Sequence, residues 1–119
     1  MPPIDNESKT LIKTVTALFI LQILARQSAY GNQIAAEIKR VTERAVQPNP
    51  NFLYPLLRQM EQDGYIEGQW ENPDTRGKRI YTITQSGHAY RQALKGIVHT
   101  KLLELERRHQ AIKKFLFEN

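Results

Sequence analysis

Apolar residues recur at helical spacing in four separate parts of the chain. The first part runs from about Lys9 to Arg26, and its apolar residues occupy almost every face of the helix that this spacing predicts. A helix that is apolar on all sides is covered on more than one side. We therefore expect this helix to lie in the core and also to contact a second subunit.

A second helix is predicted from about Asn32 onward. Its apolar stripe ends before Pro48 and Pro50, and proline both removes a backbone donor and disfavours helix at the preceding residue. The segment Tyr30–Asn32 separates this helix from the first, because glycine and asparagine favour turns. The residues expected to face the core are Ile34, Ile38, Val41 and Ala45.

A third helix is predicted over Asn51–Asp63. Asn51 has the short polar side chain that is typical of an N-cap, and Gly64 is suited to a left-handed C-cap. The outward face of this helix is polar and nearly uncharged. Its expected core residues are Leu53, Leu56, Leu57 and Met60, and its outward residues are Asn51, Tyr54, Arg58, Gln59 and Gln62.

Two short strands follow, over Tyr65–Trp70 and Arg79–Thr84. The second strand is rich in β-branched and aromatic residues, and the loop between them has strong turn chemistry in its Asn-Pro-Asp-Thr-Arg-Gly sequence. Two strands alone are marginally stable, so we expect this hairpin to pack on the helices. The basic residues expected at its exposed tip are Arg76, Lys78 and Arg79.

A last helix is predicted from an N-cap at Thr84 to about Phe117, which is long for a globular helix. Its later apolar positions follow steps of four and three residues, the pattern of a heptad seam. Pairing with a second copy of the chain would cover this seam. The predicted dimer interface combines two residues of the first helix with seven of the last. These residues are Leu11, Val15, Ile97, Val98, Leu102, Leu105, His109, Ile112 and Leu116.

The order helix, helix, helix, hairpin, long helix predicts a mainly α fold with a β-hairpin, an α+β winged helix-turn-helix. We divide the chain into a flexible N-terminus (1–8), a DNA-binding domain (9–84) and a dimerisation helix (85–119). A helix fills the major groove of DNA, and polar side chains on its outer face can meet base edges while basic side chains of the hairpin contact phosphates. The expected DNA contacts are Asn32, Gln33, Asn49, Asn51, Tyr54, Arg58, Arg76, Lys78 and Arg79.

Three motifs of the chain resemble the PadR family. The block Leu53–Arg58 (Leu-Tyr-Pro-Leu-Leu-Arg), followed by Gly-Tyr-Ile at 64–66, is similar to the family's recognition-helix signature. The block Arg76–Tyr81 is similar to its wing, and Thr84–Gly87 to the Thr-x-x-Gly that begins its last helix. The resemblance covers about Val15 to Leu94, and the single helix after the wing resembles the branch of the family with a short C-terminal part.

This resemblance implies a winged-helix transcriptional regulator, usually a bacterial repressor, that forms dimers through its C-terminal helix and often its first helix. The chain departs from the family pattern at Asn32, where many members carry an aromatic residue, and at Phe52, where they usually carry Thr or Ser. A repressor acting as a homodimer should recognise a pseudo-palindromic site on double-stranded DNA.

Composition narrows the remaining classes of function. The 119 residues carry a net charge of +5 and no cysteine, which excludes disulfides, thiol nucleophiles and thiolate metal sites. The three histidines are too far apart on a helix for one chain to share a metal ion among them. No phosphate loop or partnered nucleophile is present, so we expect no enzyme activity, no metal and no cofactor.

The location of the charge weakens the link between net charge and DNA. Residues 85–119 contain seven Lys or Arg and three Asp or Glu, so nearly all the positive surplus lies on the last helix. The longest apolar stretch, Thr14 to Ala25, is shorter than the about 20 residues of a membrane span, and the N-terminus does not resemble a secretory signal. We expect a cytoplasmic protein that does not bind membranes.

Two alternative functions stay open at this point. The chain could be a winged-helix module that binds proteins and never binds DNA. It could also be a repressor that responds to an unidentified small-molecule effector bound at the dimer interface. The sequence contains no feature that selects an operator, a regulated gene or an effector.

Overall fold

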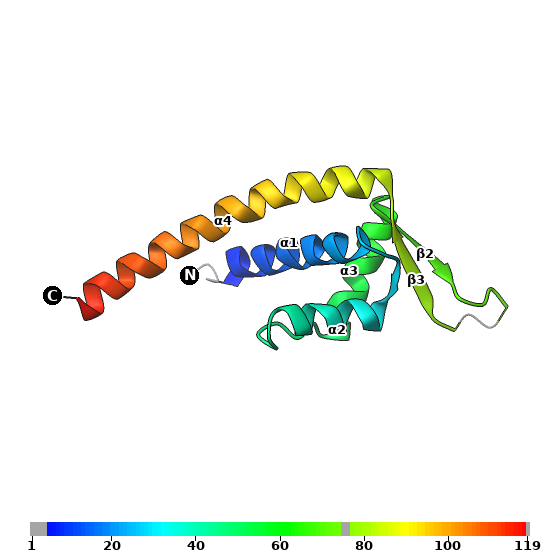
Figure 1. Cartoon of the computed structure of the whole chain (residues 1–119), viewed down its shortest axis with the longest axis horizontal. Coiled ribbons are helices and arrows are strands. Elements are labelled where there is room, and N and C mark those ends of the chain that lie inside the picture. Colours follow the sequence, from blue (N-terminus) through cyan, green and yellow to red (C-terminus); the bar gives the residue numbers. More distant parts are fainter. Residues whose placement is uncertain (1–4, 75–76, 119) are drawn as a thin grey trace.

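The computed structural model describes residues 5–74 and 77–118 (Figure 1). It confirms an α+β fold with a hairpin between the third helix and a long last helix. The elements in chain order are α1 (Asp5–Leu24), β1 (Ala29–Tyr30), α2 (Gly31–Val41), α3 (Pro50–Gln62), β2 (Ile66–Trp70), β3 (Arg79–Ile83) and α4 (Gln85–Phe117).

The molecule is elongated, with extents of 66 × 32 × 26 Å. Helix α1 lies between α4 on one side and α2 and α3 on the other, so it is covered on more than one side as predicted, and α4 of the same chain supplies the cover expected from a second subunit (Figure 1). The hairpin extends from the end of the body that is opposite the C-terminus. The largest fully buried side chains come from all layers of this body: Ile20, Leu21, Ile34, Ile38, Leu53, Leu57 and Ile66.

The hairpin belongs to a three-stranded antiparallel sheet in the order β1-β3-β2. In the central strand β3, Tyr81 pairs with Ala29 of β1 on one side and with Gly68 of β2 on the other. Strand β1 has two residues, too few for alternation to be visible, and the sequence did not predict it. It joins the start of α2 to the base of the hairpin.

Two helix boundaries differ from the predicted ones. Helix α1 begins at Asp5, within the segment 1–8 that was expected to be flexible, and residues 1–4 lie outside the described part of the chain. Helix α2 ends at Val41, and the chain then adopts positive φ at Glu43 and Arg44. The side chain of Thr42 bonds both to Ile38 O and to the backbone N–H of Val46, which replaces the next helical turn.

The predicted apolar stripe of α2 is therefore only half correct. Ile34 and Ile38 are buried, but Val41 is 48% exposed and Ala45 lies in the exposed loop after the helix. The stripe assumed that the helix continued to residue 45. Once the chain turns at residue 42, a spacing of 3.6 residues no longer brings Ala45 to the core face.

The N-cap of α3 is Asn49, and the prediction of Asn51 was wrong. The Oδ1 of Asn49 accepts a hydrogen bond of 2.8 Å from the backbone N–H of Asn51. Pro50 then occupies the first helical position, where its missing N–H has no cost. Gly64 has φ +82°, so the predicted left-handed ending of this helix is confirmed.

Thr84 and Gly87 fix the start of α4 against the end of α3. The Thr84 hydroxyl donates to Gly64 O at 2.6 Å and accepts from Gly87 N–H at 3.0 Å, which confirms the predicted N-cap. A Cβ at Gly87 would collide with the carbonyl oxygen of Tyr65. The Thr-x-x-Gly motif therefore serves a close approach between the helix and the backbone that precedes β2.

Candidate nucleic-acid interface

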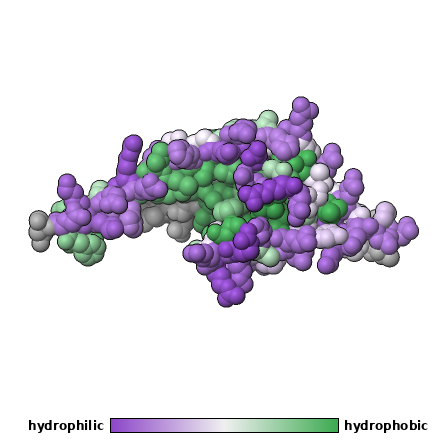
Figure 2. Space-filling view, viewed as in Figure 1, coloured by the Kyte–Doolittle hydropathy of each residue, from purple (hydrophilic) through white to green (hydrophobic). Residues whose placement is uncertain are grey.

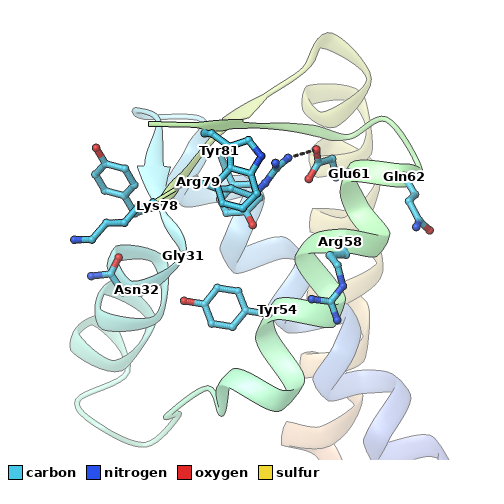
Figure 3. A pocket seen from close by; sticks show the side chains of 12 residues that line it. Gly31, Asn32, Tyr54, Arg58, Glu61, Gln62, Lys78, Arg79 and Tyr81 are labelled. Carbon is cyan, nitrogen blue, oxygen red and sulfur yellow. Dashed lines mark hydrogen bonds and ion pairs between the residues drawn. The ribbon is translucent and has the colours of Figure 1, made fainter. Parts of the chain in front are cut away.

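A cleft of about 710 Å³ lies between α3, the N-terminus of α2 and the hairpin (Figure 3). Residues from three separate parts of the chain line it. Aromatic rings and basic side chains predominate among them, with one carboxylate. The lining consists of Tyr30, Gly31, Asn32, Tyr54, Arg58, Glu61, Gln62, Trp70, Gly77, Lys78, Arg79 and Tyr81.

Helix α3 contributes its polar outer face to this cleft. Its predicted core residues are all buried, so the exposed positions Asn51, Tyr54, Arg58 and Gln62 face away from the body. In Figure 3 the side chains of Tyr54 and Arg58 project from α3, and the Tyr54 ring points towards α2. This face is available to a partner as large as DNA.

The Tyr54 ring lies directly against the first turn of α2. A Cβ at Gly31 would be 2.7 Å from Cε1 of Tyr54 and 3.2 Å from its hydroxyl oxygen. Only glycine leaves space for the ring in this position. The contact leaves Tyr54 38% exposed, with one side on α2 and the other towards the cleft.

Two of the predicted contact residues also cap helices. The Gln33 Oε1 accepts a hydrogen bond of 2.9 Å from the backbone N–H of Tyr30, at the start of α2. Asn49 is itself the N-cap of α3, and its Oδ1 accepts from the backbone N–H of Asn51. Asn32, directly before Gln33 in the chain, is exposed and lines the cleft. The structure thus brings Asn32, Tyr54 and Arg58 together at the cleft. The side chains of Gln33 and Asn49 instead cap the N-termini of α2 and α3.

On the hairpin, Lys78 lies beside Tyr30 at the edge of the cleft. Its Nζ is 5.5 Å from the centroid of the Tyr30 ring, a cation–π contact. The Tyr30 hydroxyl donates to Oε1 of Glu71 at 3.0 Å, and this hydrogen bond raises the pKa of Tyr30 above its ordinary value. These contacts hold the base of the hairpin loop close to the start of α2.

Arg79 differs from the expectation that it lies at the exposed tip. It begins β3, and its Nη2 donates to Glu61 Oε2 and to Gly68 O, at 2.5 and 2.8 Å. Its guanidinium also stacks on Trp70, 4.9 Å from the ring centroid. The side chain therefore points inward between the hairpin and α3. Arg76, also expected at the tip, lies outside the described residues.

The sequence did not single out Glu61, Trp70 and Tyr81 as part of this site. Glu61 follows Tyr54 and Arg58 at steps of four and three residues, so helical spacing could have placed it on the same face. Trp70 and Tyr81 depend on the pairing of the strands, which spacing along one strand does not reveal. Tyr81 is buried, and desolvation raises the pKa of its hydroxyl.

The seam predicted on α4 divides into a covered and an uncovered part. Leu94 and Val98 are buried within the chain, so Val98 packs in its own subunit and is not free for a partner, contrary to the prediction. Further along the helix, Leu105 is 38% and Ile112 57% exposed. Figure 2 shows an apolar band along α1 and the adjoining α4 on the face in view. Other large apolar residues exposed on the outer part of α4 are Leu102, Leu103, Phe115, Leu116 and Phe117.

Within the described residues, no three metal-ligating side chains come together. No helix in that part of the chain is long and apolar enough to cross a membrane. A small-molecule effector at a dimer interface stays a prediction.

A sequence model of the family described as "Transcriptional regulator PadR-like family" matches residues 20–93, more than half of the chain. The chain belongs to the PadR-like family of transcriptional regulators. A relative, the transcriptional regulator Rv3488 of Mycobacterium tuberculosis, is 30% identical over 77 residues, 65% of this chain and 69% of that protein. As a member of this family the protein is a DNA-binding regulator and not an enzyme.

Solved structures of similar fold extend the PadR-like comparison beyond the family match. A transcriptional regulator from Clostridium thermocellum has a TM-score of 0.64 and 24% identity, over 90% of this chain and 95% of that one. A PadR-like transcription factor from Bacteroides fragilis has a TM-score of 0.65 and 23% identity, over 91% and 99% of the two chains. These similarities confirm the winged-helix arrangement, including the long last helix.

Proposed function

We propose that this PadR-like protein is a sequence-specific repressor that binds a pseudo-palindromic operator as a homodimer. The observation that carries the proposal is the exposed polar face of α3, with Tyr54 and Arg58 on it and Lys78 across the cleft. An α-helix fits the major groove, and side chains of this kind donate to base edges and to phosphates.

The two walls of the cleft would contact different parts of the DNA. Arg58 and Tyr54 are on the helix that would enter the major groove, while Lys78 is on the hairpin that would follow the adjacent backbone. Asn32, at the start of α2, lies near the position where that helix would meet a phosphate. Contacts to phosphate position the protein, and contacts to base edges select the sequence.

The uncovered part of α4 supports the homodimer. Leucine, isoleucine and phenylalanine side chains on the outer half of this helix would remain in water in a single chain. Burial of apolar surface is worth roughly 25 cal/mol per Å², so a second copy covering this half would gain substantial free energy. Leu11 and Val15 of α1, which are half-buried, would extend the same interface.

A twofold axis through this interface would present two copies of α3 to one face of DNA. When such helices are about 34 Å apart, they enter successive major grooves one helical turn apart. The operator should then contain two inverted half-sites. Repression follows if the operator overlaps the site where polymerase binds.

The first experiment selects operator DNA from a random duplex pool with the full-length protein. We expect the selected duplexes to contain an inverted repeat. In gel shifts, the logarithm of the binding constant should fall steeply and linearly as the logarithm of the salt concentration rises. Tyr54→Ala should lower affinity for the selected duplex while the protein stays folded and dimeric. A reporter gene downstream of the selected site should be less active when the protein is present.

Two further variants complete this experiment, the first as a control and the second as a test of the hairpin contact. Gln110→Ala removes an exposed polar side chain on α4 and should leave affinity unchanged. Lys78→Ala should lower affinity and reduce the salt slope by about one, because one phosphate contact is lost. If no duplex is enriched at low salt, the protein is instead an interaction module, and the proposal is wrong.

A further inference from the structure

Arg79 makes three contacts, one to α3 and two within the hairpin. Its Nη2 donates to the Glu61 carboxylate of α3 at 2.5 Å and to the carbonyl oxygen of Gly68 in β2 at 2.8 Å. Its guanidinium stacks on Trp70, at the far end of β2. We refer to Arg79, Glu61, Gly68 and Trp70 as the latch (Figure 3 shows the Arg79–Glu61 pair).

Gly68 provides the space in which the latch closes. A Cβ at this position would be 2.5 Å from Arg79 Nη2, 2.8 Å from its Nε and 2.9 Å from Glu61 Oε1. Arg79 and Glu61 are shielded from water on one side, with side chains 26% and 31% exposed. A charge-assisted pair with additional hydrogen bonds is stronger in such a position than on an open surface.

The latch also settles the electrostatic role of Glu61. This carboxylate lies in the cleft, on the same face of α3 as Arg58, where an unpaired negative charge would repel phosphate. Pairing with Arg79 neutralises it. Because Lys78 directly precedes Arg79, the latch also sets how far Lys78 lies from Arg58 and Tyr54 across the cleft.

We propose that Arg79 is a positioning residue, which locks the wing to α3 through Glu61, Gly68 and Trp70, and is not itself a phosphate ligand. This inference rests on the proposed function, since the locked distance matters only if both walls of the cleft engage one DNA duplex. The spacing of Lys78 from α3 then determines whether the wing and α3 can bind together.

The direction in which one substitution changes the affinity for DNA distinguishes a positioning role of Arg79 from a direct contact to phosphate. Glu61→Gln removes a negative charge from the DNA-facing cleft, and electrostatics alone would therefore raise affinity for DNA. If Glu61 holds Arg79 in place, the same substitution lowers affinity. Gly68→Ala opens the latch without any change of charge, because its Cβ displaces the guanidinium.

The experiment measures binding of these variants to the duplex selected by the wild-type protein, over a series of salt concentrations. We expect Glu61→Gln and Gly68→Ala each to weaken binding by about three- to tenfold, with the salt slope changed by less than about 0.5. The exchanged pair Glu61→Arg with Arg79→Glu should recover part of this loss, because it restores the ion pair but not the contacts to Gly68 O and Trp70. Glu67→Gln makes the same change of charge on the exposed side of β2 and should have little effect.

Trp70 gives a second measurement that does not involve DNA. It is the only tryptophan in the chain, so fluorescence excited at a wavelength that the five tyrosines do not absorb reports on this part of the latch. We expect stronger quenching by acrylamide in Glu61→Gln and Gly68→Ala than in the wild type. Far-UV circular dichroism should show that both variants remain folded; where Glu61→Gln does not fold, Gly68→Ala and the exchanged pair carry the test.

Three results would overturn the inference. The first is a gain of affinity in Glu61→Gln. The second is a loss in Arg79→Gln that reduces the salt slope by about one, as expected for a direct phosphate contact. The third is unchanged affinity in Gly68→Ala despite increased quenching. Failure of the wild-type protein to bind any duplex would instead refute the proposed function, and with it the role of the latch in DNA binding.

Discussion

The ring of Tyr54 in α3 packs on the backbone of Gly31 at the start of α2. A Cβ at Gly31 would lie 2.7 Å from Cε1 of this ring, so the first turn of α2 acts as a platform for it. The two helices of the helix-turn-helix therefore determine together where the Tyr54 hydroxyl can reach.

Gly31→Ala should displace the Tyr54 ring with little effect on the fold. The colliding atoms are at the far end of a flexible side chain, so we expect the free energy of unfolding to change by less than about 1 kcal/mol. Affinity for operator DNA should fall about fivefold, or about 1 kcal/mol, because the Tyr54 ring leaves the position beside α2 from which it faces the cleft. Gel shifts and urea denaturation measure the two effects. Unchanged affinity would show that the platform does not matter for binding.

Gly87→Ala should destabilise the fold much more. Here a Cβ meets the carbonyl oxygen of Tyr65, and the backbone cannot move away as a side chain can. We expect a loss of about 2–3 kcal/mol in the free energy of unfolding, measured by urea denaturation. Ser86→Ala, at the neighbouring exposed residue, is the matched control and should cost less than about 0.5 kcal/mol. A similar small cost at Gly87 would contradict the close approach.

Gly96→Ala should stabilise the protein. Gly96 is in the interior of α4, and apart from its chain neighbours and the adjacent backbone of its own helix, no described atom lies within 4 Å of an added Cβ. Alanine is favoured over glycine in a helix by about 0.5–1 kcal/mol, which should appear as a higher urea midpoint. If the substitution destabilises the protein instead, the backbone of a partner subunit approaches α4 at this point.

Leu105→Glu should convert the proposed dimer to a monomer. The substitution places a carboxylate in the centre of the uncovered apolar stripe of α4, where a partner would otherwise bury leucine. Sedimentation equilibrium should show a dissociation constant raised by at least about a hundredfold, or about 3 kcal/mol. Gln110→Glu puts the same charge on another side of the helix and should leave the dimer intact. Equal behaviour of the two variants would exclude the seam as the interface.

Most of the helical architecture could be predicted because burial and helical period act over many residues at once. The all-round apolar character of α1 predicted its position between two layers, and the stripe of α3 predicted both its core and its exposed faces. Predictions failed where one residue turned the chain, as at Thr42, or where two asparagines could each cap a helix, as at Asn49 and Asn51. Such choices depend on single hydrogen bonds, which periodicity does not resolve.

Local pattern and motifs within single elements were enough to predict the winged-helix plan, the polar face of α3 and the apolar seam of α4. The contacts of the Arg79 side chain could not be predicted in this way. In sequence it is one of three nearby cations of a hairpin, but strand pairing places Trp70 opposite it, and its side chain reaches Gly68 O in β2 and Glu61 at the end of α3. The direction of a side chain between two elements depends on contacts that are distant in sequence, and these exist only once the chain has folded.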